Sequence, residues 1–244
     1  MTNFKCIVEY DGTLFNGWSK QPGQRTVQEE IEKALNNILN SKTNITCAGR
    51  TDKGVHASGQ VINFETEHEI SPEKLAVRLN SLLPDDIAVK TAAKTSKSFS
   101  ARKSAKYKTY IYRIYNHPVR SPLYRTRAWH ISKPLNMENM KKAASFLKGK
   151  RDFSVFDSYN SVFDYKIVDL KDVKAVKKDK FIDIHITGDR FLYKMIRKIA
   201  GELVRAGRGE QTFENFKNSI INKNKNHIGK PAPAHGLFLV RITY

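Results

Sequence analysis

Residues 4–12 read FKCIVEYDG, and the pattern that begins here is the main evidence for the fold. Apolar and polar side chains alternate along this stretch, which predicts a half-buried β-strand that ends at the Asp-Gly turn. Residues 26–40, TVQEEIEKALNNILN, follow with apolar residues on one helical face. Thr26 and Glu29 have the spacing of a capping box at the helix start. The chain is therefore expected to open with a strand followed by an amphipathic helix.

The rest of the first half repeats this alternation of strands and helices. Residues 44–48 and 59–65 are expected to be strands, and the polar stretch between them a loop. Ser71 is a predicted N-cap, with Pro72 at the first helical position, and residues 87–89 form another predicted strand. The first half thus has the order β-α-β-β-α-β.

The second half shows the same mixture of strand-like and helix-like periodicity in its apolar residues. Its expected elements are a tyrosine-rich strand at 107–116, a helix at 137–147, a strand at 181–187, a helix that ends at Gly207 and a strand at 237–244. Strands outnumber the helices between them. We therefore predict an α+β protein of two ferredoxin-like (RRM-like) halves, residues 1–105 and 106–244, with largely antiparallel sheets and helices packed on one side.

The composition is that of a folded, strongly basic protein. The 244 residues are 40% hydrophobic, too apolar for a disordered chain. The 43 Lys and Arg against 24 Asp and Glu give a net charge of +19, which favours a polyanionic partner such as nucleic acid. On charge alone, a basic ribosome-associated protein or a lysine-biased proteome explains the excess equally well.

The cysteines and the N-terminus indicate a cytoplasmic protein. Cys6 and Cys47 are far apart in sequence and form neither a zinc signature nor a disulfide framework, which suits a reducing compartment. Residues 1–10 lack the layout of a signal peptide, and no apolar run approaches the roughly 20 residues of a membrane span. No association with a membrane is expected.

The loop Arg50-Thr51-Asp52-Lys53-Gly54 holds the first candidate for chemistry. It places a carboxylate beside two cations, whose attraction keeps Asp52 ionised and available as a nucleophile or base. Taken alone, however, an Asp close to a Gly in a loop is more often turn chemistry.

Read together, an ordered set of motifs resembles the tRNA pseudouridine synthase A family. The motifs run nearly end to end: Tyr10-Asp11-Gly12-Thr13, Gly17-Trp18, Thr26-Val27-Gln28, residues 49–57 (GRTDKGVHA), Leu83-Pro84-Asp85-Asp86-Ile87, Tyr110-Ile111-Tyr112, Met195-Ile196-Arg197 with Gly201, and residues 232–237 (APAHGL). Ser19 and Lys53 depart from the family's usual Gln and Ala, and neither change removes a proposed catalytic group.

The resemblance implies an isomerisation of uridine to pseudouridine without cofactor or metal. The bond from N1 of uracil to C1′ of the ribose breaks, the base turns within the site, and C5 bonds to C1′. Asp52 is then the essential carboxylate, which attacks the uracil or the ribose or removes a ribose proton; the sequence leaves these routes open. The family also implies a tRNA substrate modified at positions 38, 39 and 40 of the anticodon stem-loop, and a homodimer.

The resemblance assigns roles to three further side chains. Arg197 is the expected cationic partner of Asp52, which requires the two halves to meet; its alternative is a solvated residue like its neighbours Lys194 and Lys198. Tyr110 is expected to stack on the flipped uracil and to help move the C5 proton, and its alternative is sheet packing. Arg50 is expected to enter the space left by the flipped base, or to act as a phosphate clamp.

Two further features can be interpreted from residue type alone. His56 is expected to stabilise the loop by hydrogen bonding rather than to act as an acid or base. Cations and aromatic rings are interleaved at residues 94–108, as along an RNA path, although a solvated charge run would look similar.

Two rivals from other classes remain at this stage. A non-catalytic RNA-binding or chaperone protein of two RRM-like halves fits the charge and the β-α-β-β-α-β order equally well, and the presence of Asp52, Tyr110 and Arg197 argues against it. A metal-dependent nuclease or phosphotransferase needs clustered acidic or histidine ligands, which the sequence does not place around Asp52.

Overall fold

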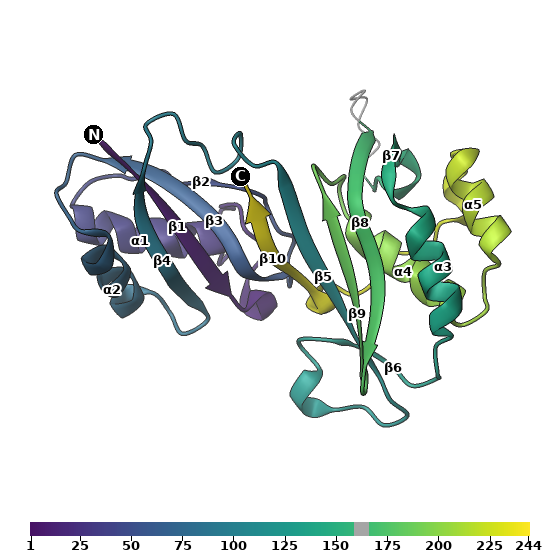
Figure 1. Cartoon of the computed structure of the whole chain (residues 1–244). Coiled ribbons are helices and arrows are strands. Elements are labelled where there is room, and N and C mark those ends of the chain that lie inside the picture. The colour runs from purple at the N-terminus through teal and green to yellow at the C-terminus, as the bar shows by residue number, and fades with distance from the viewer. Residues whose placement is uncertain (159–165) are drawn as a thin grey trace. The chain divides into compact units, whose positions relative to one another are not determined.

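The computed structural model describes residues 1–158 and 166–244, and these form two compact units (Figure 1). Unit 1 comprises Met1–Lys106 with Phe238–Tyr244, and unit 2 comprises Tyr107–Leu237. Each unit combines helices with mostly antiparallel strand pairs, which confirms the α+β fold class. The last strand, which the sequence analysis assigned to the second half, lies with unit 1.

Unit 1 has the strand arrangement of a ferredoxin-like half. Strands β4, β1 and β3 are neighbours in that order, and both pairings are antiparallel. The other edge of β3 is shared: β2 pairs with it antiparallel at residues 62–63, and β10 pairs with it parallel at residues 56–57. The elements are β1 (Thr2–Tyr10), the 3-10 helix η1 (Gly12–Leu14), α1 (Val27–Leu39), β2 (Thr46–Cys47), β3 (His56–Thr66), α2 (Pro72–Leu82), β4 (Ile87–Thr95) and β10 (Leu237–Thr243).

The core of unit 1 lies between one face of these strands and the helices. The alternating residues of β1 point into it and are at most 3% exposed: Phe4, Cys6, Val8 and Tyr10. In the apolar stripe of α1, Ile31 and Leu35 are fully buried, as the helical period predicted. The N-cap of α2 is also confirmed, because the Ser71 hydroxyl accepts the Lys74 N–H.

The prediction of a capping box at the start of α1 is wrong. Thr26 is the N-cap residue, but its side chain makes no capping hydrogen bond. Its hydroxyl is buried and, among the residues described, has no hydrogen-bond partner. The spacing of Thr26 and Glu29 was therefore not sufficient evidence for a capping interaction, which also needs the right side-chain orientation.

Unit 2 is built on strands β5, β9, β8 and β7, which are neighbours in that order and pair antiparallel, with β6 parallel to β5. Figure 1 shows α3, α4 and α5 on one side of these strands. The elements are β5 (Tyr107–Asn116), η2 (Pro122–Tyr124), β6 (Trp129–Ile131), α3 (Met137–Phe146), β7 (Gly149–Asp152), η3 (Ser154–Phe156), β8 (Ile167–Lys178), β9 (Phe181–Gly188), α4 (Met195–Gly207), α5 (Phe213–Ile221), η4 (Lys225–His227) and η5 (Ala234–Gly236).

The two faces of the unit 2 strands differ in character. On the helix side, Ile182, Ile184 and Ile186 of β9 are fully buried. On the opposite side, Arg113 of β5 donates to both carboxylate oxygens of Asp183 of β9, at 2.9 and 2.8 Å. Alternation along β9 therefore separates an apolar core face from a face of charged pairs.

Candidate functional site

Asp52 lies in a short, tightly held loop between β2 and β3. Its side chain is half-buried, and its carbonyl oxygen accepts the Val55 N–H at 3.1 Å, which closes a turn. Gly54 within that turn has φ +77°, a left-handed conformation that glycine adopts without steric cost. β3 begins at His56, so the loop is shorter at its end than the sequence suggested. Arg50 is exposed in the same loop.

Hydrogen bonds with buried polar groups hold this loop on both sides of Arg50. The Gln60 side-chain amide donates to the Gly49 carbonyl at 2.6 Å. The hydroxyls of Tyr10 and Thr51 are 2.8 Å apart and hydrogen-bonded, and the Trp18 N–H donates to the Thr51 carbonyl at 3.0 Å. Burial raises the pKa of Tyr10, so its hydroxyl stays neutral and keeps its proton. The residues that flank Arg50 and precede Asp52 are thereby fixed.

Backbone also lies directly against the Asp52 loop. Gly17, at φ +91°, is so close that a Cβ there would come within 2.9 Å of the Thr51 carbonyl oxygen and 3.2 Å of the Lys53 nitrogen. A Cβ on Gly12 would overlap the Val55 carbonyl. These two contacts explain why glycine is required at both positions of the connection between β1 and α1.

His56 has the loop-stabilising position expected for it. Its side chain is 2% exposed and stacks on Phe238, with ring centroids 4.6 Å apart. Its Nδ1 lies 3.0 Å from the Gly12 N–H and 3.1 Å from a carboxylate oxygen of Asp11. His56 thus joins β3 to β10 and to the end of β1.

Tyr110 belongs to unit 2 and is packed in its sheet. It lies on β5 opposite Ile186 of β9 and is 6% exposed. Its ring meets the Phe191 ring edge to face, with centroids 5.2 Å apart. The T-shaped contact restricts the orientation of the phenol ring.

Arg197, also in unit 2, lies in the first turn of α4 and is held by the segment before β10. Its Nε donates to the Ala232 carbonyl at 2.7 Å, and the Ala232 N–H donates back to the Arg197 carbonyl at 3.0 Å. The Tyr112 hydroxyl donates to the Pro233 carbonyl at 2.9 Å. Burial raises the pKa of Tyr112, and the charge of Arg197 acts in the opposite direction. Arg197 is therefore half-buried and is bonded through its side chain to the segment before β10.

The basic stretch after β4 lies over unit 1 and is anchored by buried amides. Asn3 donates to the Ser96 and Phe99 carbonyls at 2.9 and 3.0 Å, and Asn63 accepts the Ala101 N–H at 2.8 Å. The Phe99 ring packs on Tyr244, with centroids 4.9 Å apart. The cations of this segment that are exposed are Lys94, Lys97, Arg102, Lys103 and Lys106. Contact of this segment with RNA stays a prediction.

Sequence reasoning missed the groups that hold the Asp52 loop. Gln60 carried the clearest signal, because it is an uncharged amide within the otherwise largely apolar stretch GQVINF and is completely buried. A buried amide needs hydrogen-bond partners, and the nearest candidates are the ends of the adjoining loop. Tyr10 gave no such signal because it matched the apolar period of β1.

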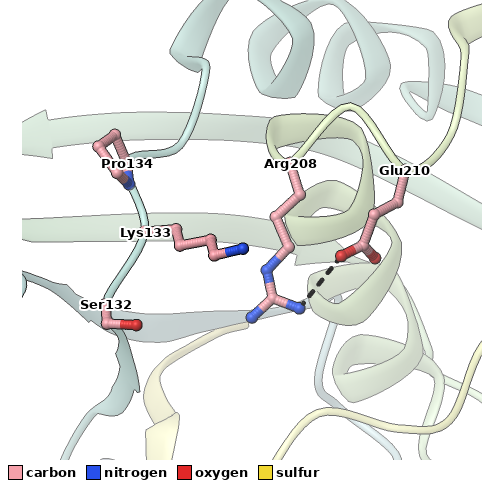
Figure 2. A pocket seen from close by; sticks show the side chains of 5 residues that line it. All are labelled: Ser132, Lys133, Pro134, Arg208 and Glu210. Carbon is pink, nitrogen blue, oxygen red and sulfur yellow. Dashed lines mark hydrogen bonds and ion pairs between the residues drawn. The ribbon is translucent and has the colours of Figure 1, made fainter.

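A hollow in unit 2 holds none of the candidate residues. It has a volume of about 500 Å³ and is lined by Ser132, Lys133, Pro134, Arg208 and Glu210. Figure 2 shows Arg208 directed toward Glu210, and the two are 3.5 Å apart. All five residues are exposed, so this is an open surface hollow whose arginine is already paired.

Residues 1–158 and 166–244 contain neither a cluster of metal ligands nor a helix that could span a membrane. No three His, Cys, Asp or Glu side chains in these ranges are grouped so that they could hold a metal ion. No helix there is both long and apolar enough to span a bilayer.

Known proteins are similar to this chain over nearly its whole length. A family model described as tRNA pseudouridine synthase matches residues 6–118 and 143–244. Proteins named tRNA pseudouridine synthase A are similar to it along all or nearly all of both chains: 41% identity in Acetivibrio thermocellus and 43% in Thermoanaerobacter sp., each over 100% of both chains, and 42% in Bacillus subtilis over 98% of both. A crystal structure of a Cbf5-Nop10-Gar1 complex aligns with a TM-score of 0.35 and 11% identity, over 82% of this chain and 53% of the other.

Proposed function

Because the chain belongs to the tRNA pseudouridine synthase family, we propose that it isomerises uridine to pseudouridine at positions 38, 39 and 40 of the tRNA anticodon stem-loop, in the cytoplasm. The observation that carries this is the full-length similarity together with the Asp52 loop. Hydrogen bonds hold that loop on both sides of Arg50, and the Asp52 carboxylate on it is half-buried. A net charge of +19 suits a polyanionic substrate.

The reaction leaves the atomic composition of the nucleotide unchanged and involves no net redox change. The N1–C1′ bond breaks, the uracil turns, C5 bonds to C1′, and the proton on C5 is lost to solvent while N1 gains one. We propose that the Asp52 carboxylate is essential, either as a nucleophile toward the uracil or the ribose or as a base toward a ribose proton. Each route needs an ionised carboxylate in a fixed position, which the hydrogen bonds to Gly49 and Thr51 support.

We assign three supporting roles by the family resemblance. Arg197 is the cationic partner that favours the ionised form of Asp52, and its bond to the Ala232 carbonyl would fix its direction. Tyr110 stacks on the flipped uracil, and its edge contact with Phe191 would limit ring rotation. Arg50, exposed on the loop, enters the space that the flipped base leaves, where a guanidinium can stack and bond phosphate.

We also propose that the protein acts as a homodimer, so that one tRNA contacts both subunits. A dimer has a mass in solution twice the 27.9 kDa of the chain, which light scattering measures directly. A monomeric mass for the active enzyme would contradict this part of the proposal.

The test of the function is tritium release from tRNA transcripts labelled at C5 of uridine. Wild-type protein in buffer with EDTA and no added cofactor is expected to release tritium, whereas Asp52→Asn, which keeps the size of the side chain, releases none above background. Asp85→Asn is the matched control, because Asp85 is an exposed carboxylate of the same unit, and it should retain wild-type release. Tight tRNA binding by wild type without release, or undiminished release by Asp52→Asn, would overturn the proposal.

A further inference from the structure

Arg25 lies just before α1 and makes an unusually complete set of contacts. Its two Nη atoms donate to the two carboxylate oxygens of Asp86, at 2.7 and 2.8 Å, in the parallel geometry that is the strongest form of this pair. Its guanidinium carbon lies 4.2 Å from the centroid of the Phe15 ring, which is 1% exposed. One side chain thus joins residues that are far apart in sequence.

These contacts immobilise the connection between β1 and α1, residues 11–26, at both ends. The Asp11 N–H donates to the Asp86 carbonyl at 3.0 Å, so Asp86 holds the start of the connection through its backbone and the end through its side chain. The Asn16 N–H donates to the Arg25 carbonyl at 2.9 Å, which closes the connection on itself.

The same connection is what lies against the Asp52 loop. Gly17 packs on the backbone of Thr51 and Lys53 so closely that no Cβ fits, and the Trp18 N–H donates to the Thr51 carbonyl. A displacement of the connection therefore moves the residues on either side of Asp52. Contacts between two backbones cannot be relieved by a change of rotamer, so the movement is transmitted.

We propose that Arg25, through its pair with Asp86, is a positioning residue for the Asp52 carboxylate. The proposal rests on the catalytic role of Asp52 proposed above. Arginine is needed because the guanidinium binds both carboxylate oxygens and stacks on Phe15 at once, whereas an ammonium group does neither with the same geometry. Arg25 itself is engaged with Asp86 and is not assigned to RNA.

The chain provides a matched control in Arg113. This arginine also binds both oxygens of an aspartate, at 2.9 and 2.8 Å, and lies over an aromatic ring, with its guanidinium carbon 5.6 Å from the Phe181 centroid. The arginine side chains are 34% exposed in the Arg25 pair and 42% in the Arg113 pair. Arg25 also lies 3.7 Å from a carboxylate oxygen of Glu30. Arg25→Lys and Arg113→Lys therefore each remove an arginine that binds both oxygens of an aspartate, in two different units.

The first measurement is the single-turnover rate of tritium release with the enzyme in saturating excess over tRNA. Arg25→Lys is expected to lower this rate by about 10-fold, since displacements below 1 Å have effects of this order. Arg113→Lys should stay within about twofold of wild type, because the Arg113–Asp183 pair is a partly exposed ion pair between β5 and β9 of unit 2. The Kd for tRNA should be the same for both variants. If Arg25→Lys reacts as fast as Arg113→Lys, the proposal is wrong.

The second measurement does not depend on activity and is the hydrogen exchange of the Trp18 and Val55 amides. These two N–H groups donate to the carbonyls of Thr51 and Asp52, so they report directly on the loop. Arg25→Lys should speed their exchange and Arg113→Lys should not; unchanged exchange in Arg25→Lys overturns the proposal even if its rate falls. An inactive wild type would overturn the function and leave this test intact. If Arg25→Lys does not fold, Asp86→Asn takes its place with the same expected results.

Discussion

The hydrogen bond between Tyr10 and Thr51 offers a quantitative test of how the Asp52 loop is held. Tyr10→Phe removes only the phenolic oxygen, which lies 2.8 Å from the Thr51 hydroxyl. The two residues are 3% and 8% exposed, so water does not replace the missing partner easily. Leaving a buried hydroxyl one partner short costs about 1–3 kcal/mol of unfolding free energy.

A double-mutant cycle separates this hydrogen bond from the other effects of the substitutions. Thr51→Val removes the partner hydroxyl and keeps the side-chain shape. The double variant should be more stable than the sum of the single losses predicts, by about 0.5–1.5 kcal/mol, which is the net contribution of one hydrogen bond. Both single variants should also slow tritium release, because each frees the residue before Asp52.

The assay is urea unfolding followed by tryptophan fluorescence in a Trp129→Phe background. Trp18 is then the remaining tryptophan, and it belongs to unit 1, with its ring centroid 6.0 Å from that of Tyr10. A coupling free energy below about 0.3 kcal/mol would mean that the two substitutions act independently, and the reasoning from this contact would be refuted.

Three other changes have expected outcomes that follow from single contacts. Thr26→Val should raise the unfolding free energy by about 1 kcal/mol in urea titrations, because the hydroxyl it removes is buried and, among the residues described, has no partner; a loss of about 1 kcal/mol would instead indicate a working cap. Gly12→Ala should destabilise unit 1 more than Gly23→Ala, since a Cβ on Gly12 overlaps the Val55 carbonyl, whereas Gly23 has open space and costs only left-handed strain of about 1–2 kcal/mol. Burial alone raises the pKa of the Asp172 carboxyl, but Lys148 and Lys174 outweigh this effect and hold the pKa below its ordinary value. The stabilisation of the folded protein by this carboxylate is complete above the unfolded pKa of about 3.9, and it is lost as the pH falls through the lower folded pKa. Asp172→Asn should therefore reduce the fall of the unfolding free energy at acid pH.

Elements with an unbroken apolar period were predictable from the sequence. The strand at 107–116 has the expected bounds, and the helix has its expected end at Gly207, because one face of each is buried. β8, Ile167–Lys178, was not predicted although it is the longest strand described. A shift of register between Leu170 and Asp172 moves its inward residues from the even positions 168 and 170 to the odd positions 173 and 175, so no single alternation runs through it.

The candidate site was predictable only in part, because its support comes from contacts across long sequence separations. The motif around Asp52 is contiguous and can be read directly. Arg25 and Asp86, by contrast, are 61 positions apart, and nothing in either neighbourhood predicts that they pair. Whether Thr26 caps α1 likewise depends on side-chain orientation, which spacing does not determine.

The two partners on one edge of β3 have a consequence for how the chain folds during translation. β2 covers residues 62–63 of that edge. On the same edge, residues 56–57, next to the Asp52 loop, pair with β10, whose residues are synthesised after all of unit 2. A nascent chain that stops after residue 106 therefore leaves this part of the edge open to pairing with other chains. His56, which stacks on Phe238, reaches its final environment only after the ribosome has passed both units.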